Sequence, residues 1–241
     1  MRIFKFQIIL ISIFFTIIGL HNGNFMAAQS KGKAIKHNMG SNPLSTNYKF
    51  DTLFADKPEY ITKSFGFPVG VPDGKGYYIG KKFWDRYSNL NHLGEDWSGE
   101  GESNSDFGDT IYAIASGYIS FSEDLGFTWG GIVGIVHKVE NKLSIFEDES
   151  IVHDTSIIQR GRYRYIESFY AHCNSELVKQ GQWVKKGDPI ATMGNSGGRF
   201  VAHLHFEIRP NANDEICNGG YAKTPEGFIE PTKFMKAYNM K

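Results

Sequence analysis

The fold class is decided by residues 110–122, TIYAIASGYISFS, which place β-branched and aromatic side chains on both sides of a Ser-Gly pair. Such residues favour strands, and a glycine between two of these runs supplies a turn. The stretch therefore predicts two short β-strands joined by a turn. Four later stretches have the same character: GGIVGIVHKV (130–139), IESFYAHC (166–173), VKQGQWVKKGDPIATMGNSGG (178–198) and AHLHFEI (202–208).

Helical periodicity is weak along the whole chain. No window of about 11 residues keeps its apolar side chains on one helical face, and only PTKFMKAY (231–238) suggests a short helix. Many short strands with glycine turns, and no alternation of strands with helices, predict an all-β sandwich or barrel. Residues 140–164, between two strand signals, form either a long hairpin or an inserted loop.

Length and charge exclude some classes of protein. The 241 residues, 41% of them hydrophobic, suit one globular domain with an appendage. The 26 basic side chains balance the 26 acidic ones and are scattered, which differs from the basic surface of a nucleic-acid-binding protein. We therefore expect no nucleic-acid partner.

The N-terminal residues 1–28 have the layout of a secretory signal peptide. A short basic start, MRIFKFQ, precedes an apolar run over residues 8–20, and small residues follow at Ala27 and Ala28. The run is shorter than the about 20 residues of a membrane-spanning helix, although an uncleaved anchor, the one membrane contact expected, stays open. Polar residues 29–49 predict a flexible spacer, and residues 50–241 the folded domain. We expect an exported protein, either periplasmic or secreted and associated with the cell envelope.

Export would place the two cysteines, Cys173 and Cys217, in an oxidising compartment, where they could form a disulfide. Strand alternation aims Cys173 away from the side that His172 faces. This argues against a thiolate ligand or a cysteine nucleophile at His172.

The strand AHLHFEI places its polar side chains on one face. Residues two apart on a strand point the same way, so His203, His205 and Glu207 share a side, while the other side is apolar. Two more histidine segments stand out, NHLGEDW with His92 and Asp96, and SFYAHC with His172. Imidazole and carboxylate suit zinc, but buried structural histidines would give the same residues. Glu207 could orient an imidazole from behind, or be a surface or salt-bridged glutamate.

The order of these motifs resembles the lysostaphin-like zinc peptidases, the family called M23 or LytM-type. NHLGEDW has its H-x-x-x-D, YAHC is similar to its Y-x-H-L, and AHLHFEI has its H-x-H-F-E. Residues 108–124 and 178–198 resemble its two glycine-rich hairpin patterns, and EPTKF (230–234) its closing D-P-x-x-F. The resemblance covers most of residues 90–235. It implies an antiparallel β-sandwich of the lysostaphin/LytM type, a duplicated hybrid motif with little helix.

The resemblance also implies roles for individual residues. His92, Asp96 and His205 would bind one zinc ion per chain, and His172 and His203 would be catalytic groups beside the attacking water. The implied function is that of an exported zinc endopeptidase acting on the peptides of bacterial peptidoglycan. The alternative is a catalytically inactive LytM-like regulator of other wall hydrolases, although such relatives typically lose zinc ligands.

Three departures from the family pattern concern specificity rather than the metal. Cys173 stands where leucine is usual, and FVAHLHF (200–206) lacks the common S-T-G-P lead-in. The connection over residues 140–164 is also longer than usual.

Overall fold

The computed structural model describes residues 43–126, 128–144, 162–210 and 219–239. The predicted signal peptide, residues 29–42 of the predicted spacer, and Cys217 lie outside these ranges. The helical elements are α1 (Pro43–Ala55), η1 (Pro58–Tyr60) and α2 (Pro231–Tyr238). The strands are β1 (Tyr77–Lys81), β2 (Arg86–Tyr87), β3 (Leu90–His92), β4 (Glu95–Gly99), β5 (Thr110–Tyr112), β6 (Gly117–Asp124), β7 (Gly131–Ser144), β8 (Arg162–Glu176), β9 (Trp183–Val184), β10 (Pro189–Met193), β11 (Leu204–Arg209) and β12 (Tyr221–Ala222).

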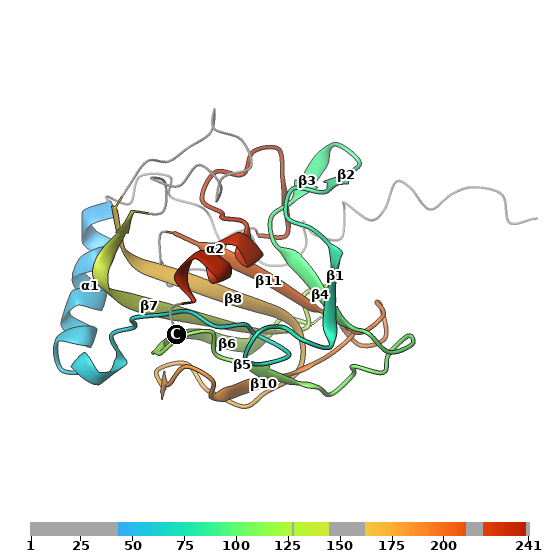
Figure 1. Ribbon diagram of the computed structural model, residues 1–241, viewed down its shortest axis with the longest axis horizontal. Coiled ribbons are helices and arrows are strands. Elements are labelled where there is room, and N and C mark those ends of the chain that lie inside the picture. The colour runs from blue at the N-terminus through green and yellow to red at the C-terminus, as the bar shows by residue number, and fades with distance from the viewer. Residues whose placement is uncertain (1–42, 127, 145–161, 211–218, 240–241) are drawn as a thin grey trace, which may run out of the picture. The chain divides into compact units, whose positions relative to one another are not determined.

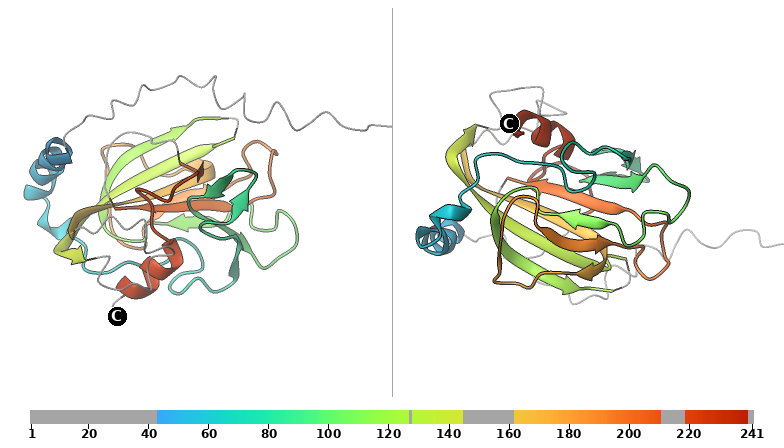
Figure 2. Two further views of the ribbon diagram at one scale, coloured as in Figure 1. Left: turned by 90° about the horizontal axis from the view of Figure 1, so that it is seen from above. Right: turned by 60° about the horizontal axis from the view of Figure 1, so that its bottom comes forward.

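The strands pair antiparallel throughout the described ranges, which confirms the predicted all-β class with little helix (Figures 1 and 2). Nine of them form one sheet in the order β1-β4-β11-β8-β7-β6-β9, with β10 pairing both β5 and β8. The long strand β8 is the branch point, because it pairs with β7 on one side and with β11 and β10 on the other. A second sheet of three short strands, β12-β3-β2, carries the first predicted ligand, His92.

The predicted strands appear where the glycine turns separate them. β5 and β6 are the two halves of residues 110–122, and PTKFMKAY is α2. β7 and β8 remain paired as far as Ser144 and Arg162, so the ends of the 140–164 segment form a hairpin, and residues 145–161 lie outside the described ranges.

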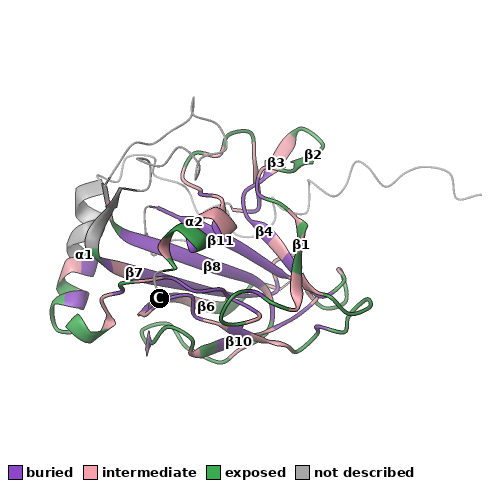
Figure 3. Cartoon of the chain, viewed as in Figure 1, coloured by how far each residue is buried: buried purple, intermediate pink, exposed green. Residues whose placement is uncertain are grey.

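The apolar face of β11 is in the main core, as predicted. Leu204, Phe206 and Ile208 are fully buried, and Phe206 packs against Tyr170 of β8 with ring centroids 5.1 Å apart. α2 lies over β11 and adds Phe234 to the same core (Figure 1). The opposite, polar face of β11 is buried as well, so the whole strand is purple in Figure 3. The charged side chains on this face must therefore form hydrogen bonds and ion pairs with one another.

The structure differs from the predicted spacer at residues 43–49, which form the first turns of α1. Proline suits a helix start, where its missing N–H costs no hydrogen bond. Phe50 and Phe54, one helical turn apart, are buried against Tyr165, with ring centroids 5.6 and 5.9 Å away. Contact with the sheet therefore stabilises this helix. The spacing of apolar residues within α1 does not reveal that contact. No helix in the described residues is long and apolar enough to cross a membrane.

A buried chain of hydrogen bonds surrounds His137 of β7. Its Nδ1 lies 3.0 Å from the Ser116 carbonyl oxygen and therefore carries the proton, which leaves Nε2 to accept from the Ser168 hydroxyl 2.7 Å away. The Ser168 and Tyr170 hydroxyls are 3.1 Å apart, and the Ile114 N–H donates to Tyr170. Burial lowers the pKa of His137 to about 4, despite the hydrogen bond to Ser116. The imidazole is thus held neutral in the fold.

We expect the free energy of unfolding to fall by roughly 3 kcal/mol between pH 7 and pH 4 through His137 alone. The unfolded chain binds a proton here below about pH 6.5, whereas the folded chain binds it only near pH 4, so stability is lost as the pH falls through that window. Urea unfolding of the wild type and of His137→Gln at several pH values measures the effect. The variant keeps a donor and an acceptor, and its stability should depend less steeply on pH. Equal slopes would contradict the prediction.

Candidate metal centre

Two consecutive short strands, β3 and β4, and the distant strand β11 bring one carboxylate and two imidazoles together. β11 pairs with β4 so that His205 lies directly opposite Asp96, and His92 ends the neighbouring short strand β3. Asp96 Oδ1 is 2.9 Å from His205 Nδ1 and 3.1 Å from His92 Nε2, and the two nitrogens are 2.9 Å apart. In the described part of the chain these are the His, Cys, Asp and Glu side chains that form a potential metal site.

Gly94, between the two ligands of NHLGEDW, allows this approach. A Cβ at position 94 would lie 2.5 Å from the carbonyl oxygen of Phe206 and 3.0 Å from Cε1 of His205. Any other residue would push the turn between β3 and β4 away from β11. The glycine therefore holds His92 and Asp96 close enough to His205 to share one ion.

Each ligand imidazole has one nitrogen that points away from the site, and the hydrogen bond of that nitrogen sets the tautomer of the ring. His92 Nδ1 lies 3.1 Å from the Lys82 carbonyl oxygen, and His205 Nε2 lies 2.9 Å from Glu207 Oε1. Both partners are acceptors, so these nitrogens carry the protons. Burial lowers the pKa of His205, but the Asp96 and Glu207 carboxylates outweigh it and raise that pKa to about 9, so without a cation Nδ1 donates to Asp96. Once that proton is released, the inward nitrogens and Asp96 Oδ1 are three acceptors with no donor among them. A cation satisfies all three at once.

The two remaining predicted histidines flank this set in the same orientation. His203 Nδ1 is 2.8 Å from the Val201 carbonyl oxygen, and His172 Nδ1 is 2.9 Å from the Ser196 hydroxyl oxygen. The two rings are in contact, with centroids 4.6 Å apart. His203 Nε2 stands 4.0 Å from Asp96 Oδ1, farther than either ligand nitrogen. His203 therefore presents Nε2 toward the site without closing it, and the His172 ring lies beside it.

The family model described as Peptidase family M23 matches residues 145–216. This part of the chain is similar to the M23 peptidases. The matched range holds His172, His203 and His205, whereas His92 and Asp96 lie before it, on β3 and β4. The pairing of β11 with β4 joins the two parts of the site.

Known proteins resemble parts of the chain. An uncharacterized metalloprotease of Haemophilus influenzae is 44% identical over 57 residues, which cover 21% of this chain and 12% of that protein. Lipoprotein NlpD of Yersinia enterocolitica is 50% identical over 42 residues, covering 17% of this chain and 42% of that protein. The chain thus spans well under two thirds of either curated relative. The catalytic domain of lysostaphin, an antimicrobial peptidase from Staphylococcus simulans, has a TM-score of 0.45 and 19% identity, covering 68% of this chain and 95% of that domain.

The donor set of His92, Asp96 and His205 fits zinc. Two imidazoles and one carboxylate form a three-ligand set that leaves a fourth position for a water molecule or a substrate. Bonds of about 2.0–2.1 Å in a tetrahedral arrangement place ligand atoms roughly 3.3 Å apart. The separations of 2.9–3.1 Å between the three atoms are a few tenths of an ångström shorter. A small outward adjustment of each side chain would accommodate the ion.

Behind His205, Glu207 makes the orienting contact that strand alternation suggested. Its Oε1 accepts from His205, and its Oε2 accepts from Arg209 Nε and Nη2 at 2.9 and 2.6 Å. Burial alone would raise the pKa of the Glu207 carboxyl, but Arg209 and His205 lower it to about 2. The guanidinium also lies 4.0 Å above the Phe169 ring. This ionised pair fixes the tautomer of His205, as outer-shell carboxylates do in metal sites.

The backbone at His172 is held in an unusual conformation. Its φ is +63°, in the left-handed region, and its N–H donates to the Trp129 carbonyl oxygen at 2.8 Å. The pairing of β8 with both neighbours shifts register here, so the strand bulges at His172. Burial, with His203 and His205 nearby, lowers the pKa of His172. Cys173 points to the opposite side, into the core, where burial raises the pKa of its thiol. It is no ligand, and its pairing with Cys217 stays a prediction.

Two residues that sequence reasoning missed hold His172 in place. The Ser196 hydroxyl donates to the Thr128 carbonyl oxygen at 3.2 Å and so accepts from His172 Nδ1. The Trp129 ring lies nearly parallel to the His172 ring, with centroids 6.4 Å apart, and edge-on to His205. The sequence indicated only that Ser196 belongs to a glycine-rich turn. In the structure its φ is +51°, a strained value for serine that is common at functional sites.

Proposed function

We propose that this protein is an exported zinc endopeptidase that hydrolyses peptide bonds in bacterial cell-wall peptidoglycan. The observation that carries the proposal is the convergence of three lone pairs, on His92, Asp96 and His205, within 3.1 Å of one another. Two further imidazoles stand beside them, each with its Nδ1 hydrogen-bonded to an acceptor and its Nε2 left unprotonated. This set suits metal-assisted hydrolysis of an amide bond better than a structural metal site, which would be closed by a fourth protein ligand.

Zinc, when bound, polarises a carbonyl and lowers the pKa of water to about 7. His203 is the side chain best placed to take up a proton at Nε2, because its Nδ1 is already committed to the Val201 carbonyl. His172, kept neutral by burial with its proton on Nδ1, can accept a hydrogen bond at Nε2 next to it. The contacts at Nδ1 prevent either ring from turning, so both present the same atom throughout a reaction.

The substrate class and export rest on sequence features. The motifs in order along residues 90–235 are those of wall peptidases of the LytM type, and the first 28 residues are typical of a secretory signal. A catalytically inactive regulator is the rival function. Retention of three ligand side chains and two flanking histidines in one geometry favours the enzyme.

Zinc content together with wall digestion separates the two functions. The full chain, purified with zinc, should hold about one ion per chain and clear a suspension of peptidoglycan, with loss of both properties on chelation and recovery on adding zinc back. A protein that holds zinc but releases no peptide fragments from the wall would favour the regulator. A protein that holds no zinc would contradict the proposal.

A further inference from the structure

Lys81, at the end of β1, points to the same side of the sheet as the ligand Asp96. β1 pairs antiparallel with β4, and Lys81 lies directly opposite Asp96 after a shift in register at Ile79. Residues directly opposite each other in an antiparallel pair project from the same face. The aminobutyl chain of Lys81 therefore leaves the sheet beside the metal centre rather than on its far side.

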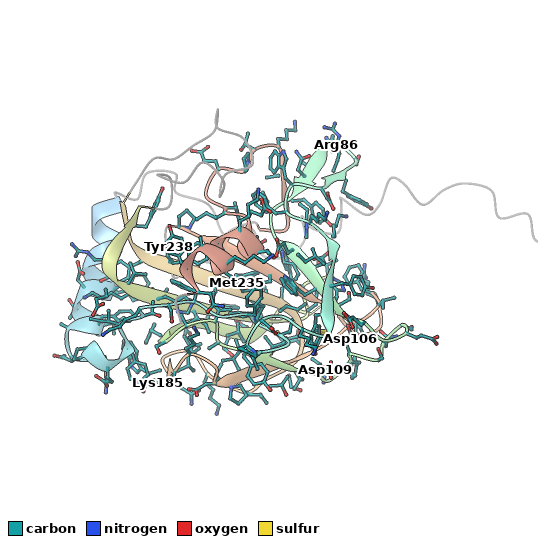
Figure 4. All side chains as sticks on the ribbon, in the orientation of Figure 1. Arg86, Asp106, Asp109, Lys185, Met235 and Tyr238 are labelled. Atoms are coloured by element: carbon teal, nitrogen blue, oxygen red, sulfur yellow. The ribbon has the colours of Figure 1, made fainter. Side chains whose placement is uncertain are left out.

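Two tyrosine rings hold the Lys81 ammonium in position. Its Nζ lies 4.7 Å from the centroid of Tyr87 and 5.1 Å from that of Tyr221, and the two rings are 5.5 Å apart. Tyr221 in turn packs on the ligand His92, with centroids 5.2 Å apart. This cluster, Lys81–Tyr87–Tyr221, involves the small sheet β12-β3-β2, whose position Arg86 marks in Figure 4. The cation is thus placed one aromatic ring away from a ligand.

The ammonium has no acidic partner among the described residues, where the ion pairs involve other side chains. Tyr221 is no counter-ion, because burial, with Asp96 and Tyr87 nearby, raises the pKa of its phenol. The Glu207 carboxylate behind the site is already matched by Arg209. A divalent ion on two neutral imidazoles and one carboxylate leaves a positive centre, and Lys81 adds to that charge. Such a site attracts an anionic group.

We propose that Lys81 binds a carboxylate of the substrate next to the bond that is cleaved, so that the site selects acidic peptides. The inference deepens the proposed function and rests on it. Lys81 is a specificity-determining residue in this assignment, since it contacts the substrate without taking part in bond cleavage. Tyr87 and Tyr221 act through it, because their faces hold the ammonium where an entering carboxylate meets it.

Digestion of peptidoglycan before and after amidation of its carboxylates tests the assignment in the full chain. The wild type should digest the native wall about tenfold faster than the amidated wall, since charge-assisted contacts are the strong ones. Lys81→Met keeps the aliphatic stem on the tyrosine rings but has no charge, and it should digest both walls at similar rates, with the loss mainly in the KM for native wall. Lys81→Arg should keep the preference, and so should Lys75→Met, which removes an exposed lysine from the loop before β1.

Two outcomes overturn the inference. One is a wild type that digests both walls equally, and the other is a Lys81→Met variant that keeps the preference. A Lys81→Met variant that loses zinc or is slowed equally on both walls would assign Lys81 a structural role instead.

Co-sedimentation with the two walls gives a readout that does not need activity. If the zinc-loaded wild type digests neither wall, the proposed function fails, but about tenfold tighter sedimentation with native wall, absent in Lys81→Met, still supports the carboxylate site. Equal sedimentation of wild type and Lys81→Met with both walls, or no sedimentation at all, would contradict the proposed carboxylate site at Lys81.

Discussion

Replacing His205 by alanine is expected to abolish zinc binding at stoichiometric metal. The imidazole supplies one of three converging lone pairs, 2.9 Å from both of its fellow ligand atoms, and it is the one whose tautomer the buried Glu207 fixes. Loss of an outer-shell partner costs roughly 10–100-fold in metal affinity, so loss of the ligand itself should cost more. Metal analysis after gel filtration, with circular dichroism to verify the fold, measures the effect.

Glu207→Gln is the graded control for this experiment. Its amide oxygen can still accept from His205, but the charge that matches Arg209 is lost. We expect weaker zinc binding by roughly 10–100-fold with the site still formed. A folded His205→Ala variant that retains one zinc per chain would show that the ion sits elsewhere, and would overturn the ligand set.

The sequence was sufficient for the strands and for the ligand candidates, for reasons that are local. A glycine turn must separate two strands, and residues two apart on a strand must share a face, so β5, β6 and the side on which His203, His205 and Glu207 lie were predictable. The grouping of His92, Asp96 and His205 followed from the family resemblance of the motifs. Spacing of four residues in NHLGEDW would not have been specific enough alone.

The features that the sequence did not reveal depend on long-range contacts. α1 lacks a strong amphipathic pattern and is stabilised by Phe50 and Phe54 against Tyr165, more than 100 residues away in the chain. The positive φ of His172 follows from the bulge between β8 and its neighbours, which no side-chain pattern encodes. Nothing in the sequence distinguishes Lys81 from other charged residues, because its position opposite Asp96 depends on the register of β1 with β4.

Replacing His203 by alanine is expected to leave zinc binding intact and to lower kcat/KM on peptidoglycan by about 10²–10⁴-fold. The imidazole is outside the ligand set, with Nε2 4.0 Å from Asp96 Oδ1, and the three ligand atoms keep their own partners without it. The expected loss is the usual contribution of a positioned general acid or base. Zinc analysis gives the metal content per chain, and the rate of release of peptide fragments from the wall gives kcat/KM.

The matched comparison is the same substitution two residues along the strand. His203→Ala and His205→Ala remove identical side chains from one face of the same segment, so a general effect of losing an imidazole there would reduce zinc content and activity alike in both. The structure predicts opposite outcomes for the metal, because His203 Nδ1 bonds to the Val201 carbonyl of its own loop, whereas His205 Nε2 bonds to Glu207. If His203→Ala empties the site as fully as His205→Ala, His203 is a ligand rather than a catalyst. If it keeps both zinc and full activity, the proton must be taken up elsewhere, and His172, 4.6 Å away between ring centroids, becomes the group to test.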